Sequence, residues 1–183
     1  MSKELRENYY LVKFKILEKV YYTFWYTDNI DGFLLDIDGM IMSFPTKEEA
    51  IGFAKEKGFL LDTEEVLISS EILRKINGTK IDCNLFLNYW NIFSDAAHSI
   101  NCQFIGDSRK GIIQHIYTKL FYGCNILVKE KEEHYKPKWN KEERRWIIRV
   151  IKDGFRILSK GLNKTGICKT GDIQTVSKKQ KWK

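Results

Sequence analysis

The stretch "NYWNIFSDAAHSINC", residues 88–102, decides how the second half of this chain folds. Its apolar residues recur at helical spacing, which predicts a helix with one face in a core. A second set of residues is spaced alternately four and three positions apart, so these residues share another face of the same helix. A solvated face normally carries lysine and glutamate, but this one carries amides, a carboxylate, an imidazole and a thiol: Asn84, Asn88, Asn91, Asp95, His98 and Cys102.

We predict that Asn88, Asn91, Asp95 and His98 form a structural polar network that locks neighbouring helices together. Asp95 beside His98 is also the pair that a hydrolase uses to orient a general base, but the chain has no GxSxG, HExxH, P-loop or dinucleotide glycine pattern. His98, Cys102 and His115 are residue types that bind metals, although isolated His and Cys in helices mostly pack or lie at the surface. We therefore expect no catalytic residue, no metal and no cofactor. Contact with a partner molecule is the alternative role for this polar face of the helix.

The first part of the chain has the pattern of a sheet. Residues 9–20, "YYLVKFKILEKV", alternate with the period of two that a half-buried strand requires. Residues 21–27, "YYTFWYT", lead through the turn signal "DNIDG" into "FLLDIDGMIMSF", which ends at residue 44. We predict an antiparallel meander, followed by a covering helix that begins with a capping box at Thr46 and Glu49 and ends at Gly58.

The later part of the chain has the pattern of helices. Residues 109–123, "RKGIIQHIYTKLFYG", and 139–161, "WNKEERRWIIRVIKDGFRILSKG", each predict one, the second opened by Asn140 and Glu143 as a capping box. Residues 64–77 fit either a helix or a strand followed by a helix. We predict an α+β fold: an N-terminal antiparallel β-meander with one or two covering helices, then a three-helix C-terminal half and a basic tail. Residues 1–160 form one domain, with halves 1–80 and 81–160, and 161–183 form a Lys-rich tail that we expect to be disordered.

Composition bounds the class of protein. The chain has 183 residues, 43% hydrophobic and 14% aromatic, enough for a packed core. No apolar run approaches the roughly 18 residues of a membrane span, and the start "MSKELRENYYLVK" lacks a secretion signal, so we expect a cytoplasmic protein without a membrane partner. Cys83, Cys102, Cys124 and Cys168 form no CxxC pair, which favours reduced thiols.

Charge divides along the chain. Residues 1–130 hold 15 basic and 18 acidic residues, and residues 131–183 hold 16 and 6, so the net charge of +7 comes from the C-terminal part. Residues 21–72 hold three lysines and eleven carboxylates, which predicts a negative potential over the N-terminal region. An acidic region attracts a basic protein, whereas a basic tail favours nucleic acid or an acidic partner.

Four carboxylates gather in the segment "DNIDGFLLDIDG": Asp28, Asp31, Asp36 and Asp38. They are ordinary turn residues, and Phe33, Leu34 and Leu35 interrupt the ligand spacing of a calcium loop. The alternative is a cluster that imitates a nucleic-acid backbone and steers a basic nuclease toward the protein.

One face of the last predicted helix is basic. Arg145, Arg149, Lys152 and Arg156 share it, opposite the apolar residues. Such a stripe is usually a solvated face, and contact with nucleic acid is the alternative.

Three segments of the chain resemble immunity proteins of bacterial contact-dependent growth inhibition and related polymorphic toxin systems. They are "LNYWNIFSDAAHSI", "IYTKLFYGCNI" and "HYKPKWNKEERRWIIRVIKDGFRIL", and the similarity spans residues 83–158. The Lys-rich tail departs from the pattern. The residues that carry the resemblance are Trp90, Asn91, Phe93, Asp95, Tyr117, Lys119, Leu120, Phe121, Pro137 and Trp139.

The resemblance implies a protein that binds the C-terminal toxin domain of a delivered effector, typically a nuclease, and blocks its active site or substrate groove without chemistry of its own. For the contact surface we expect the acidic segment Asp28, Asp31, Asp36 and Asp38, with Tyr21 and Trp25 as aromatic anchors. Two alternatives stay open. One is a nucleic-acid-binding module that uses the basic helix and the tail, and the other is a small hydrolase that uses Asp95 and His98.

Overall fold

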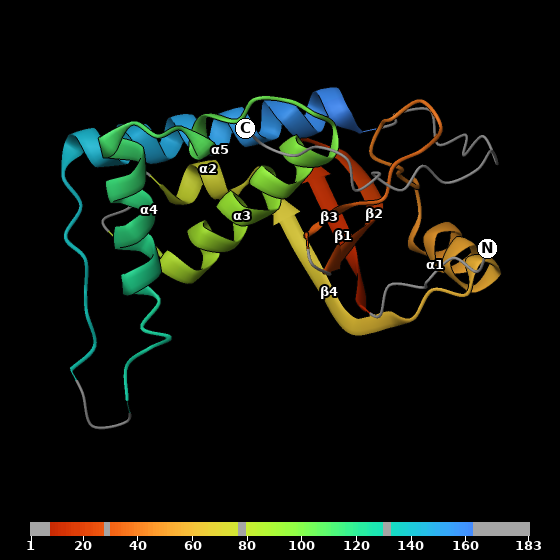
Figure 1. Ribbon diagram of the computed structural model, residues 1–183, viewed down its shortest axis with the longest axis horizontal. Coiled ribbons are helices and arrows are strands. Elements are labelled where there is room, and N and C mark those ends of the chain that lie inside the picture. The colour runs from red at the N-terminus through yellow and green to blue at the C-terminus, as the bar shows by residue number, and fades with distance from the viewer. Residues whose placement is uncertain (1–7, 28–29, 77–79, 130–132, 163–183) are drawn as a thin grey trace.

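The computed structural model describes residues 8–27, 30–76, 80–129 and 133–162. The fold is α+β, with the strands in the first half of the chain and the long helices in the second (Figure 1). In chain order the elements are β1 (Asn8–Ile16), β2 (Lys19–Thr27), β3 (Gly32–Phe33), α1 (Lys47–Lys57), β4 (Leu61–Ser69), α2 (Ile72–Lys75), α3 (Cys83–Ser99), the 3-10 helix η1 (Ile105–Asp107), α4 (Gly111–Gly123) and α5 (Lys141–Gly161).

The four strands form a mixed sheet in the order β3-β2-β1-β4. β1 pairs antiparallel with β2, and β2 antiparallel with β3. β4 instead runs parallel to β1, because the chain crosses through α1 back to the end of the sheet where β1 begins. The predicted antiparallel meander did not include this fourth strand, which makes the sheet mixed. Residues 64–77, which fitted two patterns, take the second: they complete β4 and form α2.

The predicted third strand is much shorter than its apolar run. Within the run, β3 contains only Gly32 and Phe33, because a turn at Asp36 reverses the chain. The returning segment meets β2 again at a single antiparallel bridge between Phe44 and Tyr22. The Asp36 carboxylate accepts the backbone N–H groups of Asp38 at 3.0 Å and Met40 at 2.9 Å, and Gly39 takes the positive φ of 75° that the turn needs. Turn chemistry at these residues outweighs the strand propensity of the apolar residues on either side.

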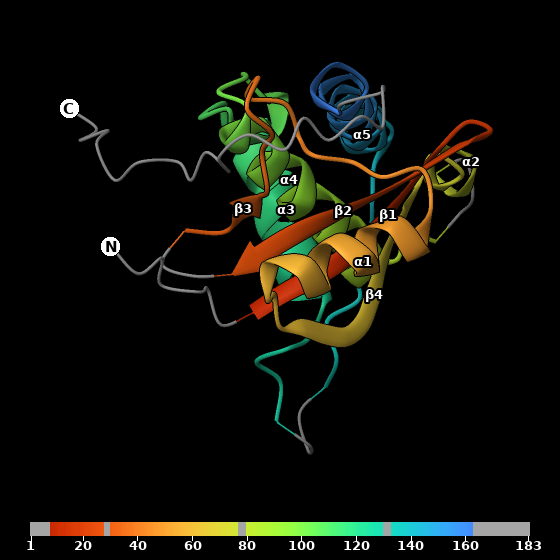
Figure 2. The same ribbon diagram turned by 90° about the vertical axis from the view of Figure 1, so that its right-hand side faces the viewer.

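The sheet is covered on both faces. α1 lies on one face and α3 on the other, as the turned view shows (Figure 2). Alternate residues of β1 accordingly enter two separate cores: Val12 and Phe14 pack with α3, while Tyr9 and Leu11 pack with α1. α1 begins and ends as predicted, with the Thr46 side chain accepting the N–H of Glu49 and Gly58 in the left-handed region.

α3 lies at the centre of the larger core. Of its apolar residues at helical spacing, Tyr89, Ile92, Phe93 and Ala96 are buried, whereas Leu85 and Ile100 are only half-buried. Trp90 is 2% exposed, and Phe86 and Ala97 are also buried, so the buried arc of α3 is wider than one amphipathic stripe. This width follows from its position, since α3 packs on the sheet, on α4 and on α5 together.

α5 crosses α3 at very short range. A Cβ atom on Gly154 would overlap the ring of Phe93, so only glycine permits this approach. The Phe155 ring packs edge-on against Phe93, with ring centroids 5.0 Å apart. The capping box predicted at the start of α5 is confirmed, with Asn140 and Glu143 each accepting a hydrogen bond from the backbone N–H of the other.

One side-chain oxygen in the described core lacks a hydrogen-bond partner. Thr23, 0% exposed on the α3 side of β2, places its hydroxyl among apolar groups. We predict that Thr23→Val raises the free energy of unfolding by about 1 kcal/mol, because it removes a buried unsatisfied hydroxyl at nearly constant shape. Urea unfolding measures the change.

Thr23→Ser is the control, because it keeps the hydroxyl and loses the methyl group. It should lower the free energy of unfolding by about 1 kcal/mol. A Thr23→Val protein less stable than the original would show that the hydroxyl is satisfied in solution.

Candidate functional site

The acidic segment after β2 does not form the surface that the sequence predicts. Asp28 lies outside the described residues, and Asp31 and Asp38 are exposed. Asp36 is only 2% exposed, with its carboxylate turned onto the backbone of its own turn. Asp36 therefore has little side-chain surface left for a partner, and both Asp36 and Asp38 lie at the turn instead of on a strand.

The two predicted aromatic anchors are also structural in large part. Tyr21 and Trp25 are half-buried and pack against the larger core beside α3. The Trp25 indole Nε1–H donates to Asp95 Oδ2 at 3.0 Å, and its ring lies 5.3 Å from that of Tyr10. Both rings therefore fix the sheet to α3, which leaves only part of each for contact with another molecule.

The exposed carboxylates of the N-terminal half gather on α1 and β4 instead. The Lys47 ammonium lies 2.6 Å from a Glu65 carboxylate oxygen, so the two elements adjoin. The excess of carboxylates over residues 21–72 already contained this signal, but their placement depends on β4 lying beside α1. We call this set the acidic surface; its exposed members are Glu48, Glu49, Glu56, Asp62, Glu64 and Glu65.

The polar face of α3 connects to three different elements. The Tyr117 hydroxyl of α4 donates to Asn91 Oδ1 at 3.0 Å, and His98 Nε2 lies 3.1 Å from Asp107 Oδ2 of η1. Asp95 accepts from Trp25 of β2, and Asn88 is exposed. Asn91, Asp95 and His98 thus tie α3 to its surroundings separately. Within the described part of the chain, no hydrogen bond joins one of the four residues to another. The partners Trp25, Tyr117 and Asp107 come from distant segments, so spacing along α3 could not identify them.

Asp95 is the most perturbed carboxylate on this face. Burial raises its pKa to about 6 against the opposing effect of the Trp25 hydrogen bond, with a smaller upward contribution from Asp31. A shifted pKa is a common mark of a functional site. Here, however, the imidazole of His98 is directed to Asp107, not to Asp95, so the hydrolase pair that the sequence offered is not assembled.

Metal ligation has no support in the described part of the chain. No three His, Cys, Asp or Glu side chains within it are grouped so that they could hold an ion. His98 pairs with Asp107, and His115 pairs with Glu143 on α5 at 3.1 Å, so the two imidazoles have separate carboxylate partners.

The basic face of α5 is partly structural. Arg145, Arg149 and Lys152 are exposed, as predicted. Arg156, although exposed, donates from Nε to the buried carboxylate of Asp153 at 2.7 Å, and Asp153 also accepts the N–H of Ile105 from η1. Arg156 therefore completes a structural pair.

An aromatic ring lies within the basic face. The Arg149 guanidinium is 4.8 Å from the centroid of the half-buried Trp146 ring, and the Lys110 ammonium is 5.9 Å from it. We call this set the basic surface: Lys110, Arg145, Trp146, Arg149 and Lys152.

The residues that carry the family resemblance mostly hold the helices together. Trp90, Phe93 and Leu120 are buried in the larger core. Lys119 lies 4.8 Å from the Trp139 ring and donates at 2.7 Å to Glu143, whose side chain is 3% exposed. Burial alone would raise the pKa of Glu143, but the hydrogen bonds from Lys119 and from the backbone of Asn140 lower it below its usual range. The resemblance thus concerns the packing of α3, α4 and α5.

No protein-family model and no curated protein sequence matches the chain. Among solved structures, the C-terminal domain of SatS, determined in complex with bromine, is similar with a TM-score of 0.50 and 12% identity, over 84% of this chain and 92% of that chain. At this identity the likeness shows the fold alone, and it supports the α+β class. None of the described helices is long and apolar enough to span a membrane.

Asp95 should make stability depend on pH in a distinctive direction. Its folded-state pKa of about 6 lies above that of an unfolded Asp, so between about pH 4 and pH 6 the folded state binds more protons than the unfolded state. Stability from this group is therefore lost as the pH rises through that window. We predict that Asp95→Asn, which keeps an acceptor for Trp25, raises the free energy of unfolding by about 2 kcal/mol at pH 7 and by much less at pH 4.

Denaturant unfolding of the two proteins across that pH range tests the prediction. Asp31→Asn removes an exposed carboxylate near Asp95 and serves as the control, with a much smaller change expected. An Asp95→Asn effect that is the same at pH 4 and pH 7 would show that the Asp95 carboxylate titrates normally.

Proposed function

We propose that this chain is an immunity protein. It binds a cognate bacterial toxin domain, a nuclease delivered by contact-dependent growth inhibition, and blocks its active site or substrate groove. Support comes from the resemblance of residues 83–158 to such proteins and from the concentration of exposed carboxylates on one region of the surface. Because a nuclease binds a polyanion, its active-site groove is positively charged, and a surface rich in carboxylates complements it.

The acidic surface is the observation that carries this proposal. Its six carboxylates face lysines at 47, 55 and 57, of which Lys47 is paired with Glu65 and Lys57 with Glu56. The charge excess is therefore not cancelled within the surface. A stable complex buries roughly 1,600 Å² in total, and α1 and β4 adjoin at the Lys47–Glu65 pair, so that one partner can contact both elements. We therefore propose α1 and β4 as the contact region, in place of the segment around Asp36.

Charge reversal tests the proposal on the rate of association. Glu48→Lys with Glu64→Lys should slow binding to the cognate toxin domain, to be sought in the neighbouring genes, about tenfold at low salt, because electrostatic attraction speeds encounter. Stopped-flow or surface-binding kinetics measures the rate. Both residues are exposed, so folding should be unaffected.

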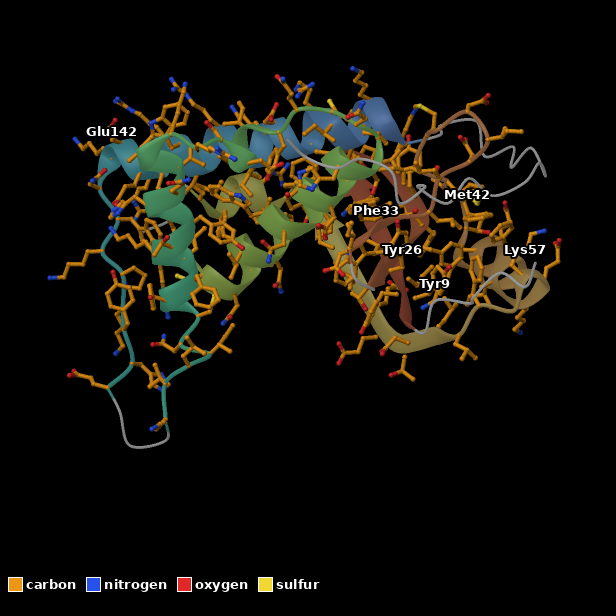
Figure 3. All side chains as sticks on the ribbon, in the orientation of Figure 1. Tyr9, Tyr26, Phe33, Met42, Lys57 and Glu142 are labelled. Atoms are coloured by element: carbon orange, nitrogen blue, oxygen red, sulfur yellow. The ribbon has the colours of Figure 1, made fainter. Side chains whose placement is uncertain are left out.

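Glu142→Lys is the matched control, because Glu142 is an exposed acidic residue at the far end of the molecule from Lys57 of α1 (Figure 3). It should leave the rate unchanged. Equal slowing by the control would place the contact elsewhere, and a chain that neither binds the adjacent toxin domain nor protects cells against it would exclude immunity.

A second candidate function rests on the basic surface. Trp146 between two cations offers a stacking platform of the kind that single-stranded nucleic acid uses. In the same experiments, a chain that fails to bind the toxin but binds single-stranded RNA, with binding lost in Arg149→Glu and falling steeply with salt, would establish this candidate instead.

A further inference from the structure

The sheet ends in an open strand on one side. β4 forms that edge, and β1 is its one neighbour among the strands of the described residues. At the opposite edge β3 has two residues, whereas β4 has nine. A long edge strand is a ready template for another chain, and natural proteins usually block it.

Hydrogen bonds at the end of β4 show which backbone groups point outward. The N–H of Ser70 donates to the carbonyl of Lys15 in the segment of β1, so residue 70 faces the sheet. The N–H of Ser69 instead donates to the Tyr89 hydroxyl at 2.6 Å, and that hydroxyl donates to the Ser69 carbonyl at 3.3 Å. Since backbone groups alternate along a strand, Glu65 and Leu67 direct their N–H and C=O groups away from β1.

Only one end of this edge is covered. The Tyr89 hydroxyl satisfies both outward groups of Ser69, much as a neighbouring strand would. Glu65 and Leu67 have no such partner among the described residues, and the Leu67 side chain is 53% exposed. The outward groups therefore lie in solvent beside an exposed apolar side chain, which together provide the two kinds of contact that an added strand uses.

The first half of β4 is unsuited to pairing. Its register against β1 shifts between the pairs at Tyr9 and Leu11, and the Asp62 carboxylate accepts the N–H of Glu64 at 2.9 Å. Such irregularities blunt an edge. From Glu65 to Ser69 the register is regular, so the open part is the second half of the strand.

Charge selects what can occupy this edge. Asp62, Glu64 and Glu65 are exposed beside it. A second copy paired through β4 would bring two such sets together, and like charges on neighbouring strands destabilise the pair. An extended segment with lysine or arginine side chains would instead gain ion pairs with them.

We infer that the outer edge of β4 binds an extended, cationic segment of the partner protein, which adds to the sheet as a further strand beside Glu65 and Leu67. This inference rests on the proposed function and names how the toxin docks. The backbone of Glu65 and Leu67 supplies the hydrogen bonds, Leu67 supplies an apolar contact, and the acidic residues select the charge.

A model peptide tests the edge without the toxin. The probe is a short peptide of alternating lysine and valine carrying a fluorophore, and its binding to the full-length chain is followed by polarisation. We expect Leu67→Pro to weaken binding about tenfold or more, because proline removes the outward N–H and leaves the bonds to β1 intact. Leu67→Ala keeps that N–H and should retain most of the affinity.

A second probe separates strand pairing from charge. The same peptide methylated on alternate backbone nitrogens keeps its lysines but cannot pair with a strand edge, so it should bind much more weakly. Equal binding of the methylated peptide, equal affinity in Leu67→Pro, or a dimer of the chain itself that Leu67→Pro dissolves would overturn the inference. Peptide binding is measured apart from cell protection, so failure of immunity and failure of the edge are distinguishable.

Discussion

The close approach of α5 to α3 at Gly154 and Phe93 is the contact on which the rest of the structure depends. A single glycine lets the two helix backbones come near enough for the Phe93 ring to lie over α5. Phe155 and Phe104 then pack edge-on against the same ring, with centroids 5.0 Å and 6.3 Å from it. The interior of a protein is packed as densely as an organic crystal, so a larger side chain at position 154 cannot be accommodated without displacing its neighbours.

α3 carries that contact to the sheet. Its Tyr89 hydroxyl closes the end of β4 at Ser69, its Ser99 hydroxyl accepts the N–H of Phe33 at 2.8 Å, and its Asp95 holds Trp25 of β2. The position of α3 therefore sets how much of the β4 edge is covered and how much stays open. α3 and α5 pack on one face of the sheet and α1 packs on the other. The carboxylates of α1 are therefore separated by the sheet and α3 from the basic face of α5.

Local signals in the sequence were sufficient for much of the fold. Capping residues located α1 and α5 because caps act within a few residues. Alternation located β1, but the run that the pattern predicts as a strand, residues 9–20, crosses the turn at residues 17–18 into β2. The apolar run after Phe33 predicted a longer strand than the structure has. The Asp36 side chain accepts the N–H groups of Asp38 and Met40, which stabilises a turn there instead. The direction of β4 depends on where α1 returns the chain, which no local pattern encodes. For the same reason the surface that we propose for partner contact differs from the predicted one: the acidic composition was visible in the sequence, but the adjacency of Glu65 to α1 was not.

Paired glycine substitutions in α5 and α1 test the central contact most directly. Gly154→Ala should lower the free energy of unfolding by about 3 kcal/mol, because the new methyl group must displace the Phe93 ring in a packed core. Gly52→Ala in α1, where a Cβ meets nothing within 4 Å, should raise it by about 0.5–1 kcal/mol through helix propensity alone. Denaturant unfolding of both variants supplies the comparison. If Gly154→Ala is as stable as the original chain, α3 and α5 do not meet as closely as described. The conclusion that this contact fixes the position of α3 against the sheet would then be wrong.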